Sequence, residues 1–105
     1  MSFIKIALAD AAEALEGSSD DFVTMMTDGE ARLLLFAPKG RDKQTPHRQD
    51  EFYVVISGSG TFRREAEIVS FAAGDVLFVP AGMDHAFETQ SDDFKAWVIF
   101  YGPRR

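Results

Sequence analysis

The chain contains two histidines, His47 and His85, and no cysteine. Any chemistry that needs an imidazole therefore depends on where these two residues fall. Glu51 follows His47 by four residues, inside an apolar segment. A carboxylate on a mostly apolar strand face is costly to bury unless it is paired or bound to a cation. Two neutral imidazoles and one carboxylate form a ligand set suited to Fe(II), and also usable by Mn, Ni, Cu or Zn.

Strand periodicity selects the residues expected beside these three. Alternate residues of an extended strand share a face, so Gln49 and Tyr53 point the same way as Glu51. By the same rule Phe87 and Thr89 share the face of His85. Gln49 is an alternative metal ligand through its amide oxygen. The candidate residues of a substrate pocket are Thr45, Gln49, Tyr53, Phe87 and Thr89.

The two histidines and Glu51 each have an ordinary interpretation as well. His47 reads as a solvated loop residue, Glu51 as a charge on an edge strand, and His85 as a capped turn residue. Taken singly, the ordinary interpretation is the better one in each case. The basic residues around position 40 are expected in a solvated loop, or as a gate for an anionic ligand at the barrel mouth: Lys39, Arg41, Lys43 and Arg48.

The elements that must position these residues are mostly strands. Residues 8–15 have the apolar spacing of one helix face, and Gly17 is a suitable end. Turn signals at intervals of roughly 8–12 residues then indicate about eight to ten short strands, which favours a sandwich or barrel. We predict one all-β domain over residues 1–105, with a helical segment at 1–20 and a barrel at 21–102. The barrel lining is expected at Leu33, Leu35, Leu77, Val79, Trp97, Ile99 and Tyr101, although a bulge would shift this alternation.

Composition excludes several classes of function. The chain of 105 residues has 11 basic and 17 acidic side chains, a formal charge of −6, which argues against nucleic acid as a partner. The absence of cysteine excludes disulfides and thiolate metal sites. No apolar run approaches the roughly 18–20 residues of a membrane span, and acidic residues interrupt the N-terminal segment before a signal sequence could form. We therefore expect a soluble cytoplasmic protein.

The positions of glycine and proline residues around the two histidines link both segments to a known family. The first segment contains His47-x3-Glu51-x6-Gly58, and the second reads Gly74-x5-Pro80-x-Gly82-x2-His85-x3-Thr89. These segments resemble the two motifs of the cupin superfamily, G-x5-H-x-H-x3,4-E-x6-G and G-x5-P-x-G-x2-H-x3-N. This sequence departs from the motifs at three points. Thr45 occupies the position of the first histidine, and four residues rather than five separate it from Gly40. Thr89 replaces the final asparagine of the second motif. The chain is most similar to small single-domain bacterial cupins.

The resemblance implies a double-stranded β-helix, or jelly-roll barrel, with a divalent transition metal in its mouth. His47, Glu51 and His85 carry over as metal ligands, and no catalytic residue is assigned. Cupins usually present three histidines and one glutamate, so Thr45 leaves this set one histidine short. Three ligands leave open coordination positions, as catalytic sites do. The implied function is a small metalloenzyme of oxygenase, isomerase or lyase type that acts on a small organic molecule.

Two expectations complete this interpretation. The alternative function is a non-catalytic module that binds or senses a small molecule and has a structural or vestigial metal site. A homodimer is the expected assembly, because two-fold dimers are the commonest oligomers. An apolar outer strand face at Phe52, Val54 and Ile56 also needs a cover.

Overall fold

The computed structural model describes residues 4–40 and 45–105, so Arg41 and Lys43 of the basic segment lie outside the described residues. The described part contains one helix and eight strands. They are α1 (Leu8–Glu16), β1 (Phe22–Asp28), β2 (Ala31–Phe36), β3 (Asp50–Ser57), β4 (Ser59–Arg64), β5 (Glu67–Ala72), β6 (Val76–Val79), β7 (His85–Gln90) and β8 (Lys95–Tyr101).

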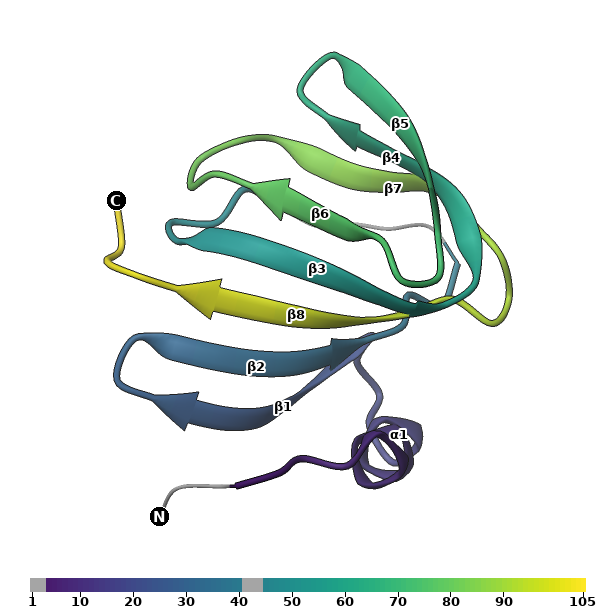
Figure 1. Ribbon diagram of the computed structural model, residues 1–105, viewed down its shortest axis with the longest axis vertical. Coiled ribbons are helices and arrows are strands. Elements are labelled where there is room, and N and C mark those ends of the chain that lie inside the picture. Colours follow the sequence, from purple (N-terminus) through teal and green to yellow (C-terminus); the bar gives the residue numbers. More distant parts are fainter. Residues whose placement is uncertain (1–3, 41–44) are drawn as a thin grey trace.

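Two antiparallel sheets enclose the core (Figure 1). The larger sheet has the strand order β1-β2-β8-β3-β6 and the smaller has β5-β4-β7. Core residues come from both sheets, as Tyr53 on β3, Phe62 on β4 and Phe87 on β7 illustrate. This is the antiparallel jelly roll that the sequence predicts.

The helix α1 packs beside the larger sheet, and its buried residues form a cluster separate from the barrel core. Ala11 and Leu15 are buried and contact Leu35 of β2. The expected helix over residues 8–15 is therefore confirmed within one residue. No helix in the described part of the chain has the length and apolar character that a bilayer crossing requires.

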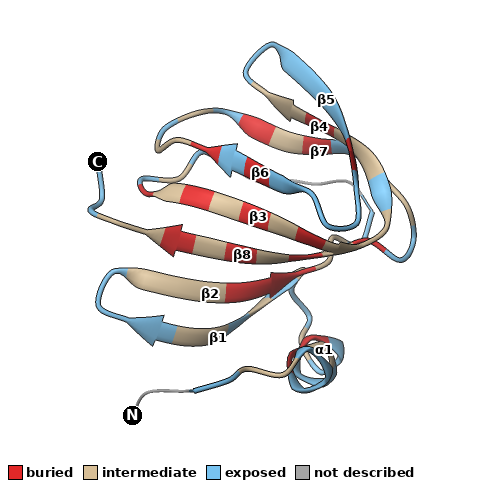
Figure 2. Cartoon of the chain, in the orientation of Figure 1, coloured by how far each residue is buried: buried red, intermediate tan, exposed pale blue. Residues whose placement is uncertain are grey.

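The barrel lining follows the opposite alternation to the predicted one on β2 and β8. Leu77 and Val79 do belong to the barrel core, but Leu35 and Trp97 belong to the cluster around α1. The buried positions of β8 alternate with half-buried ones in Figure 2. Both faces of these strands carry apolar side chains, so alternation alone does not identify the inner face. The inner residues of these two strands include Leu34, Phe36, Ala96, Val98 and Phe100, rather than Leu33, Leu35, Trp97, Ile99 and Tyr101.

The chain passes from the larger sheet to the smaller at Gly58, where no side chain fits. Gly58 has φ +87°, and a Cβ there would lie 2.6 Å from the Cα of Phe94. Two residues later, a Cβ on Gly60 would lie 2.1 Å from the carbonyl oxygen of Thr89. Because that neighbour is backbone on a paired strand, it cannot rotate out of the way. Both glycines therefore allow strands to approach closely where the sheet turns.

Gly60→Ala is expected to lower the free energy of unfolding by about 1–3 kcal/mol, the usual cost of forcing extra atoms into a packed site. The matched control is Gly17→Ala, because a Cβ at Gly17 meets nothing closer than 3.7 Å. That variant should stay within about 0.5 kcal/mol of wild type. Urea denaturation followed by circular dichroism measures both changes, and equal stability of the two variants would contradict the close approach.

Candidate metal centre

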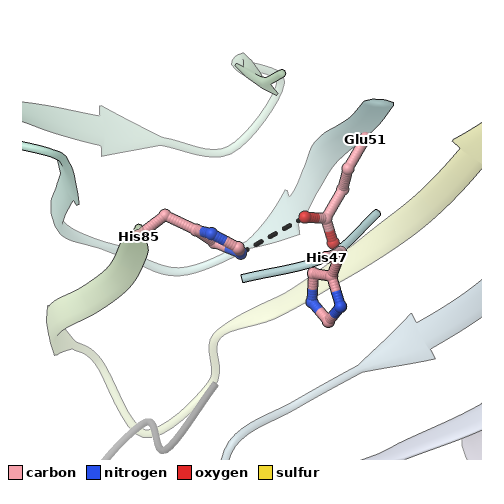
Figure 3. Close-up of side chains that lie close together, drawn as sticks. All are labelled: His47, Glu51 and His85. Carbon is pink, nitrogen blue, oxygen red and sulfur yellow. Dashed lines mark ion pairs between the residues drawn. The ribbon is translucent and has the colours of Figure 1, made fainter. Parts of the chain in front are cut away.

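Three potential metal ligands from separate elements converge at one end of the barrel (Figure 3). His47 lies in the segment before β3, Glu51 on β3, and His85 at the start of β7. One ligand atom from each lies within 4.8 Å of the others. Glu51 and His85 are each 1% exposed, whereas His47 is half-buried. The structure thus brings together the three residues that the sequence singled out.

Hydrogen bonds from two backbone amides hold the two ligand-bearing segments against each other. The amide of Gly82 donates to the carbonyl oxygen of His47 across 2.6 Å, and the amide of Ala81 donates to Oδ1 of Asp50 across 2.9 Å. Gly82 has φ +83°, a conformation that favours glycine. The Ala81 amide, together with the side chain of Arg105, holds the pKa of the Asp50 carboxyl below its usual range. The turn before β7 is therefore fastened to the start of β3, and His85 follows from it.

The imidazole of His85 is oriented by its own turn. Its Nδ1 lies 3.0 Å from the carbonyl oxygen of Met83. Because a carbonyl only accepts, Nδ1 carries the proton and donates, which assigns the tautomer from its partner. In the neutral ring Nε2 then presents a lone pair, and it lies 3.2 Å from Oε1 of Glu51. Metal-binding histidines are commonly held in this way, with the other ring nitrogen donating to a carbonyl.

The Glu51 carboxylate lies in an environment that suits a cation. Neither of its oxygens receives a hydrogen bond from the described residues, and both are buried. A buried carboxylate without hydrogen bonds is strongly unfavourable. When His85 is neutral, its Nε2 lone pair and Oε1 of Glu51 point at the same space, which a divalent cation would satisfy; a proton on Nε2 would instead make this contact an ion pair. The residues present therefore fit a metal of the kind that two imidazoles and one carboxylate bind.

A cavity of about 420 Å³ opens onto this group through His47 and Glu51. Its volume is in the range of small-molecule sites. The apolar wall comes mainly from the inner faces of β2 and β8. The lining comprises the apolar residues Phe22, Leu34, Phe36, Val98 and Phe100 and the polar residues Asp20, Asp21, Arg32, Thr45, His47 and Glu51.

Comparison with known proteins agrees with the fold and the motif spacing. The profile of the cupin domain matches residues 32–101. The chain belongs to the cupin family. An uncharacterized protein from Streptomyces coelicolor is 42% identical over 62 residues, which span 59% of this chain and 59% of that protein.

Solved structures share the cupin fold at low sequence identity. A protein of unknown function from Rhizobium leguminosarum has a TM-score of 0.71 and 20% identity, covering 98% of this cupin and 100% of that chain. The DMSP lyase DddQ from Ruegeria pomeroyi has a TM-score of 0.63 and 22% identity, covering 77% of this cupin and 46% of that chain. At these identities the similarity shows the fold alone.

The predicted pocket residues of this cupin fall into different environments. Thr45 is exposed and lines the cavity. Tyr53 and Phe87 are buried in the core, and their ring centroids lie 5.0 Å apart. Gln49 is buried, and its amide nitrogen donates to the carbonyl oxygens of Glu30 and Gly102, across 2.7 and 3.0 Å. Gln49 therefore connects backbone segments through its amide.

Thr89 lies on the exposed side of the smaller sheet because β7 contains a bulge. Thr61 pairs with Thr89 and the next residue, Phe62, pairs with Phe87, so Glu88 is one extra residue on β7. The extra residue reverses the alternation, as bulges do. The hydroxyl of Thr89 lies 2.9 Å from that of Thr61, and Thr89 does not line the cavity beside His47. The expected shared face of His85 and Thr89 is thus wrong, while that of His85 and Phe87 is correct.

Arg32 is a cavity residue that the sequence interpretation missed. It precedes Leu34 and Phe36 by two and four residues on β2, so it shares their inner face. The incorrect alternation assigned to β2 placed Leu33 and Leu35 inside and Arg32 outside. Reading Leu34 and Phe36 as the inner pair would have identified the arginine as an inward-facing charge.

Glu51→Gln should stabilise the metal-free cupin by about 1–3 kcal/mol. The change removes a buried charge and supplies an amide that can donate to Nε2 of His85. Urea denaturation in the presence of a chelator measures the effect. Glu30→Gln is the control, because Glu30 is exposed and its side chain should contribute little. A Glu51→Gln protein less stable than wild type would show that the carboxylate is satisfied without a metal.

Proposed function

We propose that this cupin is a small metalloenzyme that holds a divalent transition metal through His47, Glu51 and His85. The observation that carries the proposal is the buried Glu51 carboxylate, which has no hydrogen bond from the described residues and faces the His85 imidazole. The metal is drawn from Fe, Mn, Ni, Cu and Zn, since all accept imidazole and carboxylate ligands. The adjoining cavity supplies space for a small organic molecule.

A bound metal would act as a Lewis acid that polarises a carbonyl or enolate oxygen, which suits oxygenase, isomerase or lyase chemistry. The residues of the chain have three supporting tasks. The Met83 carbonyl fixes the ring of His85, and the Gly82 amide fixes the backbone of His47. The apolar wall around Phe100 gives a ligand a surface to pack against. The similar fold of a protein named as a DMSP lyase is compatible with lyase chemistry, without pointing to a particular substrate.

Metal content tests the proposal directly. After reconstitution with each candidate metal in turn, the wild-type protein should retain about one equivalent of at least one of them, measured by mass spectrometry. His47→Ala and Glu51→Gln should each lose most of it, because two protein ligands remain. His47 is half-buried in a loop, so its truncation spares the core. Glu30→Gln should retain the metal.

Retention of less than roughly 0.1 equivalents of every metal by the wild-type protein would refute the metal site. Metal and small-molecule binding without turnover would instead favour the binding or sensing module. Measuring product formation and ligand affinity on the same preparation distinguishes the enzyme from the binding module.

We further propose that the cupin forms a homodimer through the outer face of the larger sheet. The rings of Phe52 and Tyr101 stack there with centroids 5.4 Å apart, and Phe78 lies 5.1 Å from Phe52. Phe78 and Val76 of strand β6 are 38% and 58% exposed. Light scattering during size exclusion should give about twice the chain mass of 11.7 kDa. A mass of one chain across the concentration range would refute the dimer.

A further inference from the structure

The guanidinium group of Arg32 lines the same cavity as two of the candidate metal ligands, His47 and Glu51. Nη2 of Arg32 donates to Oε1 of Gln49 across 3.2 Å, and the guanidinium carbon lies 4.5 Å from the centre of the Phe100 ring. No carboxylate of a described residue forms an ion pair with Arg32, whereas Arg63, Arg64 and Arg105 all have such partners. The guanidinium of Arg32 is thus oriented by two neutral groups, the amide of Gln49 and the ring of Phe100.

Strand register places Arg32 in line with Glu51. Arg32 on β2 pairs with Phe100 on β8, and Phe100 pairs with Glu51 on β3. Neighbouring strands lie about 4.8 Å apart, so the backbones at Arg32 and Glu51 are separated by about 10 Å. All three side chains line the same cavity. The guanidinium lies over the intervening Phe100 ring, whose centroid is 4.9 Å from that of the His47 ring.

We propose that Arg32 binds the carboxylate of the small molecule that this cupin takes at its His47, Glu51 and His85 centre. The inference rests on the proposed function for the metal, and names the chemical class of the ligand. A guanidinium presents five N–H donors in a planar fork that matches a carboxylate. The Gln49 contact engages Nη2, and the remaining donors have no hydrogen-bond partner among the described residues.

Gln49 explains why this arginine is held in place. Its amide nitrogen is bound by the carbonyl oxygens of Glu30 and Gly102, so its Oε1 is oriented toward Arg32. Stacking on Phe100 restrains the other side of the guanidinium. An arginine already restrained in this way loses less conformational entropy when a ligand binds.

Other charges in the cavity narrow the ligand to a monocarboxylate. Asp20 and Asp21 line the cavity, and Asp20 is exposed. Asp21 Oδ1 accepts a hydrogen bond from the backbone amide of Lys39 across 3.2 Å. With Glu51 committed to the metal, these two carboxylates disfavour a second negative charge on the ligand. A dicarboxylate should therefore bind more weakly than a monocarboxylate of similar length.

The test compares carboxylates with their neutral amides by calorimetry. The probes are acetate, pyruvate, butyrate and phenylacetate, the amide of each, and succinate as a dicarboxylate. Wild-type protein, metal-loaded and metal-free, should bind at least one monocarboxylate about tenfold or more tightly than its amide. Arg32→Gln should abolish that preference, and Arg32→Lys should retain part of it. Arg104→Gln is the charge-matched control, since Arg104 is exposed, and should behave as wild type.

The outcomes separate the two proposals. A carboxylate can also ligate the metal. The contribution of Arg32 is therefore the difference between wild type and Arg32→Gln in the ratio of carboxylate affinity to amide affinity. Full metal content with no such difference, or no binding of any probe, overturns the role of Arg32 and leaves the metal site intact. A preference that depends on Arg32 in a protein that retains no metal overturns the metalloenzyme and supports the carboxylate site. Circular dichroism and metal content verify that Arg32→Gln is folded.

Discussion

The buried Glu51 carboxylate, facing the His85 imidazole, is the interaction on which the rest of the site depends. Its oxygens are removed from water and receive no hydrogen bond from the described residues. Such a group is unfavourable in an apolar interior unless a positive charge compensates it. The surrounding structure keeps this arrangement in place through hydrogen bonds that involve the neighbouring backbone rather than the carboxylate itself. The position of the carboxylate is therefore set by contacts of its neighbours, and its own oxygens remain available for a cation.

Those contacts join segments that are distant in sequence. The Gly82 amide binds the carbonyl of His47, while Asp50 binds the amide of Ala81. Pro80 and Gly82 of the second motif follow β6 and turn the chain so that the amides of Ala81 and Gly82 meet the start of β3. The spacing of the motif residues is thus the spacing that this turn requires.

Turn signals were sufficient to predict a sandwich or barrel, and the resemblance of the two motifs to those of cupins implied the jelly roll and the grouping of His47, Glu51 and His85. The sequence was insufficient for the inner face of β2 and β8. Leu35 packs against α1 outside the barrel while Leu34 packs inside it, so neither face is polar. Thr89 was misplaced by a different cause, since the bulge at Glu88 has no distinctive residue type. Arg32 was missed as a consequence of the first error.

The candidate ligands come from both sheets, with Glu51 on the larger and His85 on the smaller. An ion held by both would tie the sheets together, so separating them would require breaking a coordination bond. Ion release and opening of the barrel would then be one coupled equilibrium, because a ligand that binds only the closed form stabilises that form. In such a molecule, slow hydrogen exchange of amides in both sheets would report occupancy of a site that few of those amides touch.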